Sequence, residues 1–252
     1  MEIKHLKKIL NEFGDNVRYE HDLKKKNWFN IGGKSKVFYK AENLKELISF
    51  LKTLNNQEKI FILGAGSNTL INDKLFDGVV IKLSKNFNNI SLHSENTIIA
   101  GSAVLDKSLS DFAMKNSLSG FEFLSCIPGS IGGGITMNAG CFGREFRDIL
   151  LSIQAIDYFG NIITIPSKDI KFEYRKNNLP EDLIFLSASF NGVKSDSLKI
   201  NDEIIKLKTE KDKNQPTKIK TSGSTFKNPT LQTKKKVWEL IKESVPLNKS
   251  FG

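Results

Sequence analysis

Two glycine-rich segments, each directly after an apolar run, constrain the fold of this chain most. The first is FILGAGSNTLINDKLFDGVVIKL, residues 61–83, in which Gly64 and Gly66 break an apolar run and precede Ser67 and Asn68. Glycines after a strand let the backbone turn with positive φ and aim consecutive N–H groups at one point, where they can bind phosphate. The alternative is a tight turn with a local Asx hydrogen bond. The spacing is not the dinucleotide-binding fingerprint, because no third glycine and no long helix follow.

The second segment is GFEFLSCIPGSIGGGITMNAGCFGREF, residues 120–146, which holds seven of the 18 glycines. Pro128 and Gly129 are followed by the glycine triplet 132–134, so this backbone carries few side chains. Such a backbone lets a planar or diphosphate ligand approach closely, although it also suits a crowded crossing of two chain segments. Two segments of this kind in one chain favour a cradle for a dinucleotide.

The apolar patterns predict the elements that carry these segments. Around the first segment we expect a β-α-β-turn-β unit: strand 36–41, helix 43–54 capped by Asn43, a buried strand 59–64 and strand 78–83. We also expect strands 96–104, 150–160, 161–166 and 183–190, and helices 3–13, 105–116, 197–213 and 234–245. The first glycines thus follow the carboxyl end of a strand, and the charged helix 197–213 is interpreted as a linker to a third unit.

Composition narrows the class of protein. With 39% hydrophobic and 10% aromatic residues, the 252-residue chain can build a packed core, and no apolar run approaches the roughly 18–20 residues of a membrane helix. The charged N-terminus is not a secretory signal, so we expect a cytoplasmic protein without membrane insertion. The net charge of +10 fits a small anionic ligand as well as nucleic acid. Because the lysines form no stripe interleaved with aromatic residues, we expect no nucleic-acid partner.

Three arginines are candidates for ligand contacts. Arg175, in FEYRKNN, is one of only four arginines beside 34 lysines, which makes it a candidate for a bidentate or planar contact. Its alternative role is a surface salt bridge. Arg144 and Arg147 follow the glycines of the second segment and could equally pair with Glu145 or Asp148.

Ser224 and the two cysteines are the remaining candidates. Ser224, in SGSTFKNP, can present its hydroxyl to a ligand or can simply occupy a turn. A serine nucleophile needs a base, and the three histidines, at positions 5, 21 and 93, lie in no motif, which disfavours a Ser-His-Asp site. Cys126 and Cys141 lack metal or redox spacing, so we interpret them as small packed residues and expect no disulfide and no metal site.

The motifs NWFNIGG, GAGSNTLINDKLFDGVVIKL, FEFLSCIPGSIGGGITMNAGCFGREF, FEYR and GSTFKNP, in this order, resemble the UDP-N-acetylenolpyruvoylglucosamine reductase family. The likeness runs from about Asn27 to the C-terminus. It implies an α+β protein with an FAD-binding fold of the vanillyl-alcohol-oxidase (PCMH) type. Residues 1–26 would form an N-terminal helix or arm, 27–84 and 85–193 two subdomains that clasp FAD, and 197–252 an incomplete α/β substrate-binding domain.

The resemblance also implies an activity. It is the NADPH-dependent, FAD-mediated reduction of UDP-N-acetylglucosamine enolpyruvate to UDP-N-acetylmuramate, which serves peptidoglycan synthesis, cell shape and cell division. Arg175 would hold and polarise the substrate carboxylate, and Ser224 would protonate C2 after hydride reaches C3. FAD would be bound non-covalently by two sets of residues. These are Gly64, Ala65, Gly66, Ser67, Asn68, Thr69 and Leu70 at the diphosphate, and Ile127, Pro128, Gly129, Ser130, Gly133, Gly134 and Asn138 near the flavin.

The chain departs from the family pattern at three places. Phe142 stands where the family commonly has Tyr, and Trp28 stands where a small hydroxyl residue is usual. The family also continues for several dozen residues past SFG, with a catalytic Glu that pairs with the Arg. We therefore expect either a fragment or a shortened product, and a truncated, catalytically impaired FAD-binding protein is the alternative function. An oxidase of the wider flavin family is a weaker third reading, because covalent flavin attachment usually needs His or Cys and the loop 61–72 has neither.

Overall fold

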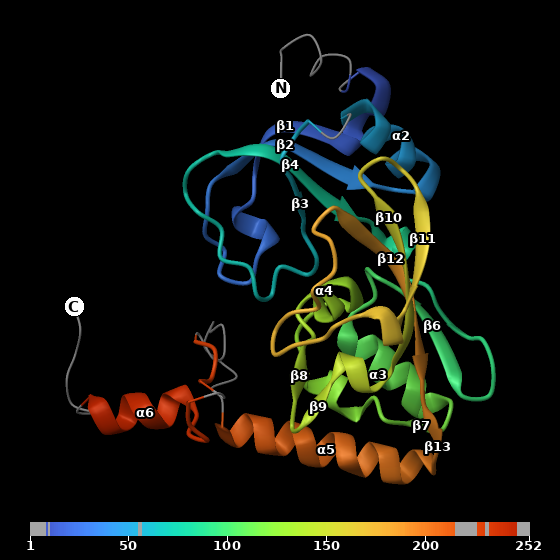
Figure 1. The fold of residues 1–252 in the computed structure, drawn as a ribbon, viewed down its shortest axis with the longest axis vertical. Helices are drawn as coiled ribbons and strands as arrows, with labels where there is room; N and C mark the ends of the chain where they lie inside the picture. Colours follow the sequence, from blue (N-terminus) through green and yellow to red (C-terminus); the bar gives the residue numbers. More distant parts are fainter. Residues whose placement is uncertain (1–8, 10, 55–56, 215–225, 230–231, 246–252) are drawn as a thin grey trace.

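The computed structural model describes residues 9, 11–54, 57–214, 226–229 and 232–245, and these residues build two β-sheets (Figure 1). The first sheet has the strand order β1-β2-β4-β3 and the second has the order β11-β10-β12-β6-β5. The first sheet lies at the top of Figure 1, and the second lies below it. The mixture of helices and strands in both regions confirms the expected α+β class.

The first sheet contains the β-α-β-turn-β unit that the sequence predicts. Its elements are β1 (Val17–Asp22), β2 (Lys34–Ala41), α2 (Leu44–Leu54), β3 (Ile60–Ile62) and β4 (Phe76–Leu83). β2 and β3 both run parallel to β4, while β1 is antiparallel to β2. Asn43 caps α2, since its Oδ1 accepts the N–H of Glu46 at 2.9 Å. β1 belongs to the stretch expected as an N-terminal arm, whose predicted helix 3–13 lies mostly outside the described residues.

β3 is not the buried strand that the apolar run 59–64 predicts. It is the edge strand of the first sheet, and the side chain of Phe61 at its centre is 42% exposed. The buried residue is Leu63, which follows the strand and is 2% exposed. A short apolar run does not reveal whether a strand has one neighbour or two, so its burial was misjudged.

The second sheet is antiparallel and carries its helices on the side of the second glycine-rich segment. Its strands are β5 (Ile90–Leu92), β6 (Thr97–Gly101), β10 (Leu150–Asp157), β11 (Ile162–Pro166) and β12 (Leu183–Asn191). The helices are α3 (Asp106–Lys115) and α4 (Ile131–Thr136), with the 3-10 turn η4 (Glu122–Cys126). The turn predicted at 159–161 joins β10 to β11 and is closed by Asp157 Oδ1, which accepts the N–H of Asn161 at 2.8 Å.

Shorter elements complete the described chain. The two-residue strands are β7 (Leu118–Ser119), β8 (Gly140–Cys141), β9 (Arg144–Glu145) and β13 (Val193–Lys194). The other 3-10 turns are η1 (Gly14–Asn16), η2 (Lys24–Lys26), η3 (Lys85–Phe87), η5 (Phe146–Asp148) and η6 (Ser167–Asp169). Both cysteines are free thiols, as expected, and Cys141 Sγ donates to the carbonyl of Phe123 at 3.3 Å.

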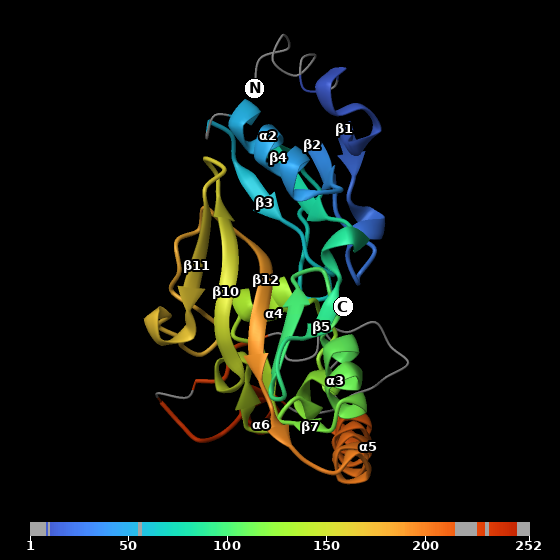
Figure 2. The ribbon, with the colours of Figure 1, turned by 90° about the vertical axis from the view of Figure 1, so that its right-hand side faces the viewer.

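One apolar core joins the two sheets. It combines Val79 and Ile81 of β4 with Ile156 of β10 and Ile184 of β12. The β10–β11 hairpin also leans on α2, where Gly160 lies against Ile48. Figure 2 shows the hairpin standing beside the first sheet. The carboxyl ends of the parallel strands therefore face the second sheet across a packed contact, which fixes where the two glycine-rich segments can meet.

The charged helix predicted at 197–213 is present as α5 (Ser197–Asn214), and it packs against the second region of the protein instead of serving only as a linker. Ile200, Ile204 and Leu207 recur at helical spacing, are buried, and form the stripe of α5 that faces α3 and η4. Lys211 Nζ donates to the carbonyl of Cys126 at 2.8 Å. α6 (Val237–Ser244) lies beyond the end of α5 in Figure 1. Within the described part of the chain, no helix has the length and apolarity to cross a bilayer.

Candidate functional site

The first glycine loop begins directly after β3 and is held in place by the segment NWFNIGG. Gly66 has φ +75°, and a Cβ on it would lie 2.2 Å from the carbonyl oxygen of Lys26. The backbone N–H of Trp28 donates to the carbonyl of Gly66 at 3.0 Å. Gly66 is therefore required both for its positive φ and for this close approach of two backbones.

The same segment also holds the far end of the loop. The backbone N–H of Gly33 donates to the carbonyl of Asn72 at 2.9 Å. Inside the segment, the buried Asn27 donates from Nδ2 to the carbonyls of Leu23 at 3.1 Å and Ile31 at 2.7 Å. Residues 27–33 thus brace the glycine loop at both ends, a role that sequence reasoning did not assign to them.

Between these braces the loop 64–70 offers polar groups to the outside. Asn68 is exposed, Ser67 is half-buried, and Leu70 is 75% exposed. The side chains of Ser67 and Asn68 make no hydrogen bond to any other described residue. The local Asx turn offered as the alternative is found later in the loop, where Asn72 Oδ1 accepts the N–H of Lys74 at 2.8 Å. The loop 64–70 is therefore a surface with free donors and little side-chain bulk.

The second segment is pinned to the chain that follows β6. The N–H of Ile131 donates to the carbonyl of Val104, and the N–H of Gly132 to the carbonyl of Ser102, both at 2.9 Å. These bonds fix the turn that leads into α4. They also place Gly133, the next residue, on the exposed side of the helix.

The glycines of the second segment serve two different purposes. A Cβ on Gly134 would lie 2.3 Å from the ring of Phe146, and one on Gly140 would lie 2.2 Å from the carbonyl oxygen of Arg144. At these two positions the crowded crossing is what the structure shows. At Gly133 an added Cβ would meet only Ser130 Oγ, at 3.8 Å, so this glycine leaves open surface.

The structure brings the two glycine-rich segments together. A Cβ on Gly64 would lie 2.8 Å from Ser130 Oγ and 4.0 Å from Gly133 Cα. In Figure 1 the loop after β3 descends toward α4, the helix that Gly133 belongs to. The bends predicted from two distant parts of the sequence therefore share one site between the two sheets.

Lys82 borders this junction, and sequence reasoning did not single it out. Its ammonium nitrogen donates to the carbonyl of Gly64 at 2.5 Å. Burial and the nearby charge of Lys26 lower the pKa of Lys82 below its usual value. In GVVIKL this lysine follows three consecutive apolar residues near the end of the strand, where a lysine ordinarily points to solvent.

A buried carboxyl lies beneath the second glycine loop. Asp106, the first residue of α3, is fully buried, and neither of its side-chain oxygens has a partner among the described residues. Desolvation raises the pKa of Asp106 to about 8. Its Oδ2 would lie 2.5 Å from a Cβ on Gly129, so the carboxyl touches the loop backbone. Nothing in the local sequence distinguishes this aspartate from an exposed N-terminal helix residue.

Arg175 lies at the tip of a tight turn. Glu173 and Lys176 exchange backbone hydrogen bonds of 2.9 and 3.2 Å, which leaves Tyr174 and Arg175 at the tip with φ +61° at Arg175. Arg175 Nη2 donates to the carbonyl of Gly140 at 3.3 Å, and its guanidinium is 5.2 Å from the ring centre of Tyr174. Within the described residues it pairs with no carboxylate, so the surface salt bridge is not what this structure shows.

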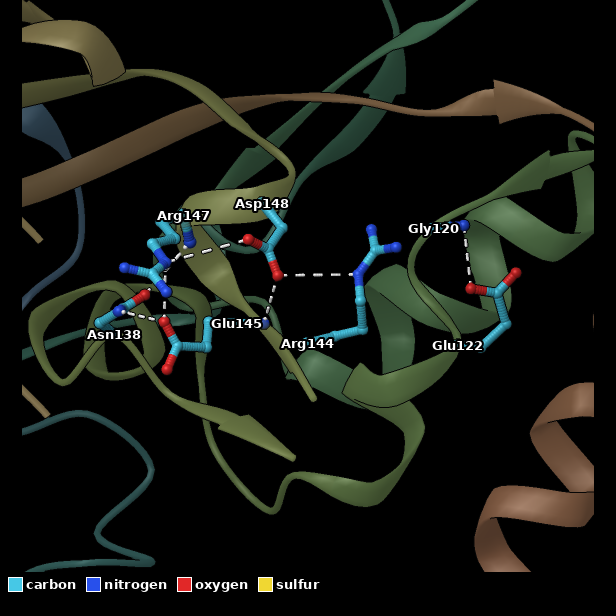
Figure 3. Close-up of polar contacts among 7 residues, drawn as sticks. All are labelled: Gly120, Glu122, Asn138, Arg144, Glu145, Arg147 and Asp148. Atoms are coloured by element: carbon cyan, nitrogen blue, oxygen red, sulfur yellow. Dashed lines mark hydrogen bonds and ion pairs between the residues drawn. The ribbon is translucent and has the colours of Figure 1, made fainter. Parts of the chain in front are cut away.

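The other two arginines do pair with carboxylates, as Figure 3 shows. Arg147 Nε lies 2.9 Å from Glu145 Oε2, and Arg144 Nε lies 3.7 Å from Asp148 Oδ2. Asn138 joins this network, because its Nδ2 donates to Glu145 at 2.8 Å and its Oδ1 accepts the N–H of Arg147 at 3.2 Å. Asn138 is fully buried, so its amide is committed to other protein groups.

Further contacts link the turn of Arg175 to its surroundings. Asn138 Nδ2 also reaches the carbonyl of Glu173 at 3.3 Å, which ties the second glycine segment to this turn. The N–H of Asn228, in the GSTFKNP motif, donates to the hydroxyl of Tyr174 at 3.4 Å. Ser224, the candidate proton donor of the same motif, lies outside the described residues.

Comparisons with known sequences agree on one family. The FAD binding domain family matches residues 35–166. A UDP-N-acetylenolpyruvoylglucosamine reductase from Pelagibacter ubique is 62% identical over 252 residues, covering 100% of this chain and 83% of the relative. The reductase of the same name from Rickettsia typhi is 47% identical over 222 residues, covering 88% of this chain and 74% of that protein.

Solved structures give the same result for the fold. The crystal structure of UDP-N-acetylenolpyruvylglucosamine reductase (MurB) from Thermus caldophilus superposes with a TM-score of 0.78 at 28% identity, over 90% of this chain and 80% of that one. p-Cresol methylhydroxylase superposes with a TM-score of 0.53 at 13% identity, over 77% of this chain and 44% of that one, a likeness of fold alone. The expected PCMH-type fold is confirmed.

Proposed function

This chain belongs to the UDP-N-acetylenolpyruvoylglucosamine reductase family, and we propose that it uses FAD to reduce UDP-N-acetylglucosamine enolpyruvate to UDP-N-acetylmuramate with NADPH as the electron donor. One observation carries the proposal. The first glycine loop meets the second at Gly64, whose added Cβ would lie 2.8 Å from Ser130 Oγ and 4.0 Å from Gly133 Cα. Two loops poor in side chains, meeting between two sheets, fit a long cofactor with a central diphosphate.

The residues of the site fit FAD as a non-covalent cofactor. The loop from Gly64 to Leu70 would hold the diphosphate with backbone N–H groups and with the free side chains of Ser67 and Asn68. Residues 127–134 would border the flavin ring, with the open surface at Gly133 facing it. Asn138 would support this loop from behind instead of touching the cofactor, because both ends of its amide bond to the protein. Bound FAD supplies hydride transfer from NADPH to the enolpyruvyl ether.

Arg175 would bind the carboxylate of the enolpyruvyl group. Its guanidinium donates one hydrogen bond to the carbonyl of Gly140, and its other N–H groups form a planar set of donors that can bind a carboxylate. When hydride arrives at C3, negative charge develops at C2 and on the adjacent carboxylate. A guanidinium held in place by Gly140 and Tyr174 stabilises that charge without having to reorganise.

Ser224 would supply the proton that C2 requires. A serine hydroxyl is a weak acid, but it can protonate a strongly basic carbon when it is held against it. The contact between Asn228 and Tyr174 supports this assignment, because it ties the GSTFKNP motif to the residue next to Arg175. Asn228 Oδ1 also accepts the N–H of Val237 at 3.0 Å, which links the motif to α6.

We extend the proposal to organisation and location. Residues 27–84 and 85–193 would be the two FAD-clasping subdomains, with 1–26 as an N-terminal arm whose strand β1 joins the first sheet, and 197–252 as part of the substrate-binding domain. The reaction would take place in the cytoplasm, where NADPH and UDP-sugars are available. Its partners would be these two small molecules, with no nucleic acid involved.

The experiment begins with the colour of the purified chain. We expect a yellow protein that releases FAD on denaturation, and a colourless preparation that FAD cannot reconstitute would contradict the proposal. Stopped-flow absorbance then separates the two half-reactions. NADPH should bleach the flavin and the enolpyruvyl substrate should restore its colour. Bleaching without recovery would instead identify an FAD-binding protein that does not complete turnover.

Two variants assign the roles within the second half-reaction. Arg175→Lys keeps the charge and loses the planar fork, so it should leave bleaching by NADPH unchanged and slow recovery by at least about 100-fold. Ser224→Ala should likewise spare bleaching and slow recovery. Equal losses in both half-reactions would remove the substrate roles proposed for these two residues.

A further inference from the structure

Two lysines lie beside the first glycine loop, one from the sequence before it and one from the sequence after it. Lys82, at the carboxyl end of β4, donates from Nζ to the carbonyl of Gly64 at 2.5 Å. Lys26 directly precedes the segment 27–33 that braces the loop, and its carbonyl oxygen would lie 2.2 Å from a Cβ on Gly66. Both side chains are half-buried, so their charges are less screened by water than those of the exposed lysines.

Neither ammonium group has a counter-ion among the described residues. The ion pairs of the described lysines involve Lys34, Lys36, Lys40, Lys171, Lys206 and Lys235. The ammonium of Lys26 instead lies 5.5 Å from the ring centre of Phe38. The two cations feel each other, because the charge of Lys26 is one of the causes that lower the pKa of Lys82. Two half-buried like charges beside one loop are unfavourable unless an anion comes between them.

We propose that Lys82, assisted by Lys26, is a clamp for the diphosphate of the cofactor, and that it supplements the backbone N–H groups of the glycine loop. The inference rests on the proposed function, in which this loop holds that diphosphate. The diphosphate of FAD carries two negative charges, which match the two ammonium groups in number. The bond from Lys82 to Gly64 already orients the ammonium group along the loop, so little reorganisation is needed when the anion arrives.

The test compares a ligand that carries a diphosphate with one that does not. Apoprotein of the full chain is titrated with FAD, and then with ADP and with adenosine in competition with FAD. In Lys82→Gln we expect the Kd for FAD to rise about 10-fold or more at low salt, and the preference for ADP over adenosine to fall by a similar factor. The slope of log Kd against log salt concentration should also become shallower.

Three further variants act as controls. Lys82→Arg keeps a cation in place and should retain most of the ADP preference. Lys26→Gln should show a smaller loss than Lys82→Gln. Lys36→Gln removes the same charge from the same sheet, but Lys36 pairs with Asp77 across β2 and β4 at 2.6 Å, so it should leave ADP preference and FAD affinity unchanged.

The outcomes separate this inference from the proposed function. If the wild-type apoprotein fails to bind FAD, both the proposed function and the proposed role of Lys82 are wrong. If the wild type binds FAD and Lys82→Gln keeps the ADP preference, only the clamp is wrong. A loss of affinity for ADP and adenosine by the same factor would overturn it as well, because it would show that the bond to Gly64 only maintains the shape of the loop.

Discussion

The two glycine-rich segments resemble each other in sequence and differ in how they use glycine. In the first, Gly66 is needed because its φ is +75° and because a Cβ on it would lie 2.2 Å from the carbonyl oxygen of Lys26. In the second, Gly134 has no positive φ and is needed because the ring of Phe146 occupies the place of a side chain. Gly133, beside it, faces open space. Glycine density therefore indicates that backbone comes close to something, and only the structure tells whether that is a ring, another backbone or a free surface.

The largest expected effect separates Gly134 from its neighbour. In Gly134→Ala the new Cβ would meet the ring of Phe146 at 2.3 Å, and this ring is fully buried between Phe123 and Phe190 and cannot move aside. We expect a loss of about 3 kcal/mol in the free energy of unfolding, from overpacking of a closed core. Urea denaturation of the apoprotein measures it. A variant as stable as the wild type would show that α4 can shift, and the contrast with Gly133 would then disappear.

The next effect is expected at Asp106, whose buried carboxyl lies beneath the second glycine loop. Burial raises the pKa of Asp106 to about 8, above its unfolded value of 3.8, so the folded state holds a proton that the unfolded state has lost. Stability from this group is therefore present below pH 4 and is lost as the pH rises toward about 8. Asp106→Asn removes the ionisation, so it should match the wild type near pH 4 and become steadily more stable than the wild type as the pH rises toward about 8.

Denaturation of both apoproteins across this pH range measures the difference. Asp111 provides a matched control, because it lies on the same helix and is not buried, so Asp111→Asn should leave the pH profile as it is. Parallel profiles for wild type and Asp106→Asn would show that the carboxyl has a polar partner in solution.

Much of the fold could be predicted from local patterns, and the limits are physical. Helix α2 and the β10–β11 turn follow from side chains that bond within a few residues, such as Asn43 and Asp157. The burial of β3 could not be predicted, because it depends on how many strands lie beside Phe61. Likewise, the burial that raises the pKa of Asp106 depends on neighbours such as Gly129, which is distant in sequence. The sequence could predict two phosphate-binding motifs. It could not predict that the two loops meet, because no sequence pattern indicates the contact of Gly64 with Ser130.

Gly133→Ala tests the open surface directly. Its Cβ would meet only Ser130 Oγ, at 3.8 Å, so the folded protein should tolerate it, and alanine is the better helix former within α4. We expect unchanged or slightly higher stability together with FAD affinity weakened about 10-fold, because a methyl group would stand where the cofactor packs. Flavin fluorescence quenching measures the affinity. Unchanged affinity would mean that the open face of Gly133 is not part of the cofactor site.

The smallest effect is expected at Arg144, which helps to distinguish structural arginines from the substrate-binding one. Its ion pair with Asp148 spans 3.7 Å, and the two side chains are 49% and 34% exposed, so Arg144→Gln should cost less than about 0.5 kcal/mol. FAD affinity and both half-reactions should stay as in the wild type, in contrast to the slow recovery expected of Arg175→Lys. Arg175 differs because it pairs with no carboxylate among the described residues, so its positive charge is available to bind an anionic ligand. If Arg144→Gln slowed substrate-driven recovery several-fold, the cationic site would have to be extended along the second glycine segment toward β9.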